Sequence, residues 1–114
     1  MKNGLYSIHV SLLDGNTGKG SGVVVLRDGE ILGGDAFLFY VGSYTMQNET
    51  FRGEVVVNQH TPSKDVIPLF GGRQVSIGIH GKFAGDSAEM EGTALVGKAS
   101  QFFRVTFRKL AEAR

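Results

Sequence analysis

The chain has no cysteine and no tryptophan, and only two of its 114 residues are proline. Without cysteine it can form no disulfide, no thiolate metal site and no cysteine nucleophile. Twelve basic and eleven acidic residues leave a formal net charge of +1, so no overall field attracts nucleic acid or an anionic membrane. Its apolar runs are about five residues long, against the roughly 20 that a membrane-spanning helix needs. Because no secretion signal opens the sequence, we expect a cytoplasmic protein that does not enter membranes.

Glycine is abundant instead, with 17 residues, which is about twice its usual share. The glycines lie at the ends of, or inside, short segments rich in Val, Ile, Phe and Tyr. Several of these segments alternate apolar and polar residues, which is typical of β-strands with one wet face. The pattern predicts strands at residues 5–13, 23–26, 30–32, 36–45, 51–60, 75–83, 90–96 and 103–107. The final residues, 109–114, are expected to form one helical turn at most.

The turns between these segments favour an antiparallel meander. Asp28-Gly29 lies between two apolar runs and predicts a tight hairpin, because both residue types tolerate positive φ. Eight strands make the smallest barrel that is filled by side chains or holds one small ligand. We therefore predict a single all-β domain over residues 1–114, an eight-stranded antiparallel meander β-barrel of lipocalin-like form. An open sandwich is the alternative.

No catalytic, metal or cofactor site is predicted. His9, His60 and His80 fall on the polar parity of their strands, outside the predicted barrel, and at no spacing typical of metal ligands. The sequence has neither a nucleophile elbow nor a phosphate-binding loop. The basic residues near the carboxyl end lack interleaved exposed aromatics, so we expect no nucleic-acid binding. We interpret the protein as a non-enzyme.

The chain has more apolar residues in two of its strands than the inside of one barrel can bury. The segments 23–26 and 36–45 are apolar on both parities, so half of their side chains should lie outside the barrel. A second copy of the chain would cover them, and we predict a homodimer. We assign the partner or dimer surface to Val24, Leu26, Leu38 and Tyr40.

Two further apolar groups concern the barrel mouth and interior. The long loop at residues 61–72 contains an apolar run that either plugs one mouth or lines the entrance to a cavity. The residues of this run are Val66, Ile67, Leu69 and Phe70. Inside the barrel, the side chains expected to line a cavity for a small apolar ligand are those of Tyr6, Phe103 and Phe107.

Several glycine-centred motifs occur together in the first half of the chain. They are Gly4-Leu5-Tyr6-Ser7-Ile8, Gly20-Ser21-Gly22-Val23, Arg27-Asp28-Gly29-Glu30-Ile31, Gly33-Gly34-Asp35 and Tyr40-Val41-Gly42, with His60 beyond them. Together they resemble the GrlR-type negative regulators of bacteria, over about residues 4–60. The resemblance implies a dimeric lipocalin-like barrel that binds and blocks a transcriptional activator. It also marks Gly33, Gly34 and Asp35 as a motif turn, in which Asp35 has a turn or cap role.

One segment departs from that family. The regulator that represents it contacts its activator through a run of acidic residues after the Tyr-X-Gly strand, whereas residues 45–50 of this chain contain only Glu49. Any partner must therefore be bound by shape and apolar contact. We predict a regulatory module that captures a protein partner such as a transcriptional activator. The alternative is an intracellular binder of a small apolar ligand inside the barrel.

Overall fold

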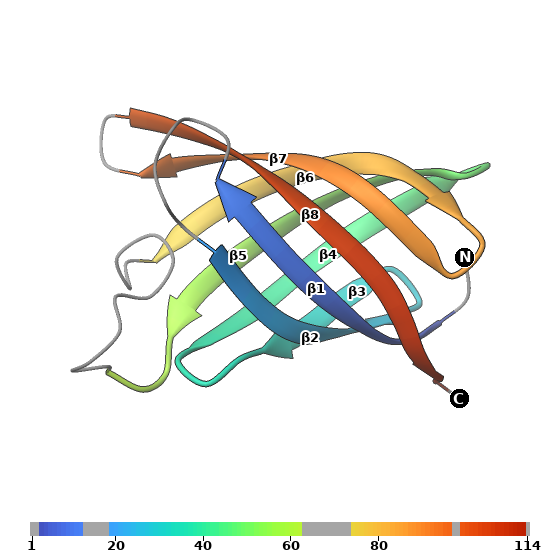
Figure 1. Ribbon diagram of the computed structural model, residues 1–114, viewed down its shortest axis with the longest axis horizontal. Helices are drawn as coiled ribbons and strands as arrows, with labels where there is room; N and C mark the ends of the chain where they lie inside the picture. The colour runs from blue at the N-terminus through green and yellow to red at the C-terminus, as the bar shows by residue number, and fades with distance from the viewer. Residues whose placement is uncertain (1–2, 13–18, 63–73, 97–98, 114) are drawn as a thin grey trace.

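The computed structural model describes residues 3–12, 19–62, 74–96 and 99–113, and it shows one closed barrel (Figure 1). Every strand pairs antiparallel with the next one in sequence, and the last pairs with the first. The strands are β1 (Gly4–Leu12), β2 (Lys19–Arg27), β3 (Glu30–Gly34), β4 (Leu38–Gln47), β5 (Thr50–Gln59), β6 (Val75–Ala84), β7 (Ser87–Val96) and β8 (Ala99–Glu112). This confirms the eight-stranded meander and excludes the sandwich.

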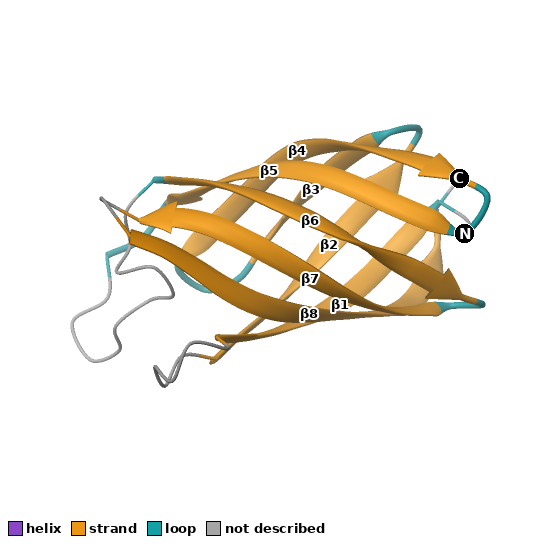
Figure 2. Ribbon diagram, turned by 90° about the horizontal axis from the view of Figure 1, so that it is seen from above, coloured by secondary structure: helices purple, strands orange, loops and turns teal. Residues whose placement is uncertain are grey.

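The two ends of the barrel differ. At one end, here called the turn end, two-residue turns join β2 to β3, β4 to β5 and β6 to β7, and both termini lie beside them (Figures 1 and 2). In the first of these turns Asp28 and Gly29 have φ of 50° and 87°, as the sequence predicted for a hairpin. The opposite end is called the loop end. The turn that joins β3 to β4 there, at residues 35–37, lies wholly within the described ranges.

β8 extends further than the sequence predicted, in both directions. β8 continues to Glu112, so the expected helical turn at the end of the chain is wrong. The reason is pairing, because Gly4 and Leu5 of β1 find their partners at Glu112 and Ala111 of β8. A register shift between Leu5 and Tyr6 accommodates an extra residue of β8 there.

No helix in the described ranges is long and apolar enough to cross a membrane.

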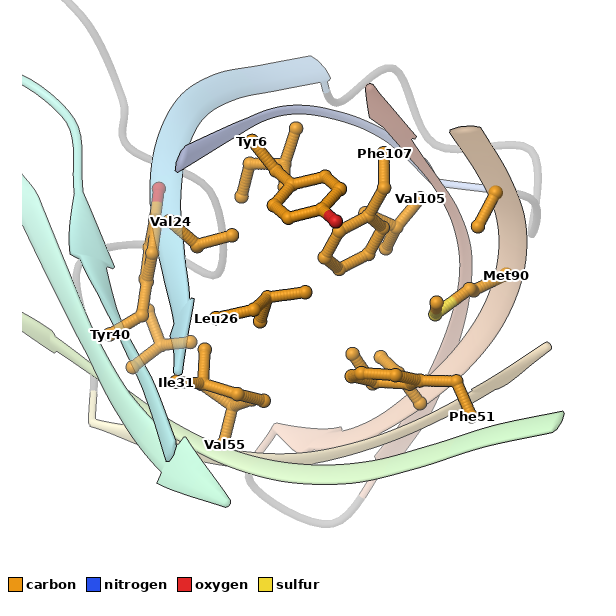
Figure 3. Packing of buried hydrophobic residues seen from close by; sticks show 14 of the residues in the cluster. Tyr6, Val24, Leu26, Ile31, Tyr40, Phe51, Val55, Met90, Val105 and Phe107 are labelled. Atoms are coloured by element: carbon orange, nitrogen blue, oxygen red, sulfur yellow. The ribbon is translucent and has the colours of Figure 1, made fainter. Parts of the chain in front are cut away.

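The barrel interior is apolar and rich in aromatic rings. Tyr6, Phe51, Phe83 and Phe107 pack against one another with ring centroids 5.7–6.1 Å apart, and Tyr44 stacks on Phe51 at 5.0 Å. Figure 3 shows side chains of this cluster directed inward from strands all around the barrel. Among the described residues no polar or charged one is buried, so apolar burial holds this core together.

Glycines on the inner face let strands and rings approach closely. A β-carbon on Gly42 would overlap the backbone oxygen of Glu54 and lie 2.9 Å from the Cα of Val55. The same atom on Gly92 would overlap the ring of Phe103. These positions are therefore filled by neighbouring atoms of the chain itself. Gly42 thus marks a close approach of the β4 and β5 backbones.

Candidate functional site

The β3–β4 turn at the loop end is organised by the carboxylate of Asp35. Its Oδ1 accepts hydrogen bonds from the backbone N–H groups of Phe37 and Leu38, at 2.9 and 2.8 Å. Its Oδ2 accepts one from the hydroxyl of Tyr40 at 2.6 Å, while its own backbone N–H donates to the oxygen of Leu38. The turn or cap role predicted for Asp35 is confirmed, and the contact to Tyr40 was not foreseen.

His60 ties the end of β5 to this turn. Its Nε2 lies 3.0 Å from the backbone oxygen of Asp35 and its Nδ1 lies 2.6 Å from Oγ1 of Thr61. A carbonyl oxygen only accepts, so Nε2 carries a proton that it donates, and Nδ1 of the neutral ring accepts from the Thr61 hydroxyl. The backbone N–H groups of His60 and Thr61 both donate to the oxygen of Phe37. We call Asp35, Tyr40 and His60 the loop-end latch.

Gly22 makes room for the latch. A β-carbon there would lie 2.8 Å from the oxygen of Gly34 and 3.0 Å from the hydroxyl of Tyr40. Burial, followed by the hydrogen bond and the charge of Asp35, raises the pKa of Tyr40 far above its ordinary value of 10.0. Tyr40 therefore stays protonated and acts as a hydrogen-bond donor. No nucleophile is activated here, and the arrangement stabilises the loop end.

The motif turn predicted at Gly33, Gly34 and Asp35 is partly wrong. β3 includes both glycines, and only Asp35 belongs to the turn. Gly33 remains in the strand because it pairs with Val24 of β2 and Tyr40 of β4. A side chain is excluded there, since a β-carbon would overlap the backbone oxygen of Val23. The motif residues Gly22, Gly34, Asp35, Tyr40 and His60 nevertheless converge at the loop end.

The predicted surface through Val24, Leu26, Leu38 and Tyr40 is wrong. All four side chains point into the barrel, with exposed fractions of 0–9%. The outward positions of the same strands have the opposite parity. Together with Leu32 of β3 and Val56 of β5 they form what we call the apolar face, which consists of Val23, Val25, Leu32, Phe39, Val41 and Val56. Five of these are exposed, by 39–49%, and Val25 is half-buried.

The predicted cavity residues do lie inside the barrel. Tyr6, Phe103 and Phe107 are buried, with exposed fractions of 0–3%. They contribute to packing, because Phe107 contacts the Phe51 and Phe83 rings and Phe103 occupies the space beside Gly92. The apolar loop run of Val66, Ile67, Leu69 and Phe70 lies outside the described residues.

The outer wall has a shallow groove across β4, β5, β6 and β7. At its centre Gly78 faces outward, and nothing lies within 4 Å of the place where its side chain would be. The groove is lined by Ser43, Thr45, Arg52, Glu54, His80 and Thr93, among others. Sequence reasoning missed it, because the absence of a side chain at one outward position leaves no trace in the apolar pattern. We call it the Gly78 groove.

The three histidines are exposed, as predicted, and they lie on β1, at the end of β5 and on β6. Within the ranges that the structure describes, no three His, Asp or Glu side chains are grouped as a metal ion would require. No protein-family model matches the chain, and no curated protein sequence matches it significantly. The similarity to GrlR-type regulators therefore rests on the glycine-centred motifs and stays a prediction.

Proposed function

We propose that this barrel is a non-enzymatic regulatory module that captures a protein partner, such as a transcriptional activator, on its outer wall. The packed interior carries the proposal. Space beside the inward Gly53 and Gly92 is occupied by the chain's own side chains, including Phe51, Ile79 and Phe103. Binding is thereby directed to the outside. The GrlR-like motifs support a regulatory role, and an activator as partner places the module in the cytoplasm.

The Gly78 groove is the place that we assign to this partner. Arg52 and Glu54 offer one charge of each sign, and the hydroxyls of Ser43 and Thr93 both donate and accept hydrogen bonds. Such a mixed lining suits a segment of polypeptide with exposed backbone groups. The absence of a strong charge of one sign agrees with recognition by shape.

A small apolar ligand inside the barrel is the competing function. It would need to displace the aromatic rings that now contact one another at 5.7–6.1 Å. Opening such space in a close-packed core forfeits many van der Waals contacts. The packing therefore favours capture on the outer wall over ligand binding within.

Affinity purification from native cytosol tests the proposal. The tagged wild-type protein is compared with the variant Gly78→Arg, whose side chain fills the groove. The variant should fold, because nothing lies within 4 Å of a β-carbon at position 78. Thr106→Arg, at an exposed outward position of β8, is the matched control. We expect one protein in stoichiometric amount with the wild type and the control, and much less with Gly78→Arg.

Two outcomes would overturn the proposal. Equal recovery with Gly78→Arg would remove the groove as the binding site. Recovery of no protein, together with a lipid or other apolar molecule in native mass spectra of the purified barrel, would establish the competing function.

A further inference from the structure

The centre of the Gly78 groove has room for one side chain. Gly78 faces outward from β6, and nothing lies within 4 Å of the place where its β-carbon would be. Its neighbours on the same outer face all carry side chains, and they are Ser76 and His80 along β6, Glu54 on β5 and Thr93 on β7. Figure 2 shows these three strands side by side. A partner that contacts this wall can therefore insert a single side chain above Gly78.

Glu54 supplies the formal charge beside this open position. It pairs directly with Gly78 across the sheet, and β-carbons in such pairs are about 4.5–5.5 Å apart. Arg52 lies two residues away on the same face of β5 and pairs with His80, so it is diagonal to Gly78. Diagonal neighbours are about 7–8 Å apart. The negative charge is therefore closer to the open position than the positive charge.

The carboxylate of Glu54 is available to a partner. Within the described ranges its side chain forms neither an ion pair nor a hydrogen bond, whereas Glu89 of β7 is paired with Arg104. An apolar side chain inserted beside Glu54 would leave this charge unpaired and cut off from water, and an acidic side chain would be repelled. The open position therefore favours a basic side chain.

We infer that the partner inserts an arginine side chain above Gly78 and that Glu54 binds its guanidinium group. This inference rests on the proposed capture at the Gly78 groove and names the group that is recognised there. Glu54 and Thr93 lie on opposite sides of β6, about 10 Å apart at their Cα atoms, because neighbouring strands are about 4.8 Å apart. A guanidinium group donates two N–H groups to one carboxylate and directs its other N–H groups elsewhere. It can therefore reach Glu54 and the hydroxyl of Thr93 together.

Lysine fits this position less well than arginine. Its ammonium group is a compact point charge, and it does not match acceptors that are spread over two strands. Arginines at the centre of an interface are also frequent among the residues that contribute most to binding. One such ion pair, shielded from water once the partner covers the groove, adds a specific contact to recognition by shape.

Selection of displayed peptides tests the inference without the natural partner. A library of short random peptides on phage is selected on the wild-type protein, and peptides that also bind Gly78→Arg are removed. We expect arginine at one fixed position in the remaining peptides. The variant Glu54→Arg reverses the charge beside Gly78, so it should select aspartate or glutamate at that position instead.

The affinity of a selected peptide gives the size of the effect. We expect Glu54→Gln to weaken binding about tenfold, measured by fluorescence anisotropy of the labelled peptide. Glu30→Gln is the matched control and should bind as the wild type does. Glu30 is exposed and lies in the same row as Glu54, on the other side of Ser43, but it does not line the groove. Circular dichroism shows whether each variant keeps the strand content of the wild type.

Changes in the peptide provide a second measurement of the same contact. Citrulline has nearly the shape of arginine without its charge, so this replacement should weaken binding to the wild type about as much as Glu54→Gln does. Binding to Glu54→Gln should then change little when citrulline replaces arginine, because the partner charge is already gone. Lysine in the same place should also bind the wild type more weakly than arginine.

Selected peptides without a preferred arginine, or with lysine equally frequent at the same position, would overturn the inference. The capture experiment from cytosol separates it from the proposed function. Capture that is lost in Gly78→Arg and kept in a folded Glu54→Gln variant would leave the groove as the binding site and reject the arginine. Selection of arginine peptides without any captured protein would support the arginine contact and reject the proposed function.

Discussion

The two halves of the barrel wall share one interior and differ on the outside. From β2 to β5 the outward positions include the apolar face beside charged residues such as Glu30 and Glu54. From β6 to β8 they carry His80, Lys82, Glu89 and Arg104. Exposed apolar side chains do occur in the second half, at Leu95 and elsewhere, but the cross-strand partner of Leu95 is Ser100. The inward rows alternate normally in both halves. The inner residues of both regions serve one core, so the difference is confined to the outer surface.

The largest effect on stability is expected from a substitution in the apolar core, which both halves of the wall share. Phe51→Ala removes a ring that contacts Tyr44, Phe83 and Phe107 and is fully buried. We expect a loss of about 3–5 kcal/mol in the free energy of unfolding, from lost burial and the cavity left behind. Urea unfolding followed by circular dichroism measures it. Val56→Ala, on the apolar face, is the control and should cost far less, because Val56 is 39% exposed.

Glycine substitutions compare the two halves directly. Gly42→Ala places a methyl group against backbone atoms of Glu54 and Val55, and we expect it to cost about 1–3 kcal/mol. Gly78→Ala meets nothing within 4 Å and should leave stability unchanged or raise it slightly, since alanine has less freedom to lose on folding. Thermal unfolding of both variants measures the difference. Equal destabilisation would contradict the contrast between a close contact at Gly42 and open space at Gly78.

The loop-end latch is expected to give an effect of similar size that depends on pH. Tyr40→Phe leaves one acceptor of Asp35 without its donor and should cost about 1–3 kcal/mol near neutral pH. Because the pKa of Tyr40 is raised in the folded state, only the unfolded chain releases this proton as the pH rises above 10.0. Wild-type stability should therefore fall above that pH. Urea unfolding at pH 8 and pH 10.5 should show a smaller decrease for Tyr40→Phe, and an identical decrease would contradict the raised pKa.

The smallest effect is expected on the charged half of the outer wall. Arg104 lies 3.3 Å from Glu89, and both side chains are about half exposed or more. Exposed pairs of this kind contribute about 0–1 kcal/mol, so Arg104→Ala should hardly change the unfolding midpoint. Urea unfolding followed by circular dichroism measures it. A loss well above about 1 kcal/mol would contradict a weak, exposed pair.

The fold could be predicted from the sequence because alternation and two-residue turns define strands locally. Which side of an all-apolar strand faces inward was predicted wrongly, since Val24 and Val23 are alike in chemistry. The sequence did contain a clue. The Asp28-Gly29 turn pairs Arg27 with Glu30, and if these charged residues face outward, Leu26 and Ile31 must face inward. Register propagates that parity along β2.

The loop-end latch could be predicted only in part. An aspartate before a turn commonly caps backbone N–H groups, so the contacts to Phe37 and Leu38 follow from residue type. The contacts of Tyr40 and His60 to Asp35 depend on how β4 and β5 pair at the loop end, and no local sequence pattern predicts that. Gly22 was conspicuous in the sequence, but its reason lies in the backbone oxygen of Gly34 and the hydroxyl of Tyr40, which leave no room for a side chain.

Pairing of β1 with β8 has a consequence for how the chain folds. It joins residues such as Ser7 and Arg108, which are 101 positions apart. Bringing them together costs chain entropy before the contacts between the two strands can form and stabilise the barrel. Hairpins along the meander can form early, whereas circularisation comes last. Until then β1 and β8 each expose unpaired backbone groups that another unfinished chain could bind. Slow refolding, and aggregation that increases with concentration during refolding rather than in the native state, should follow.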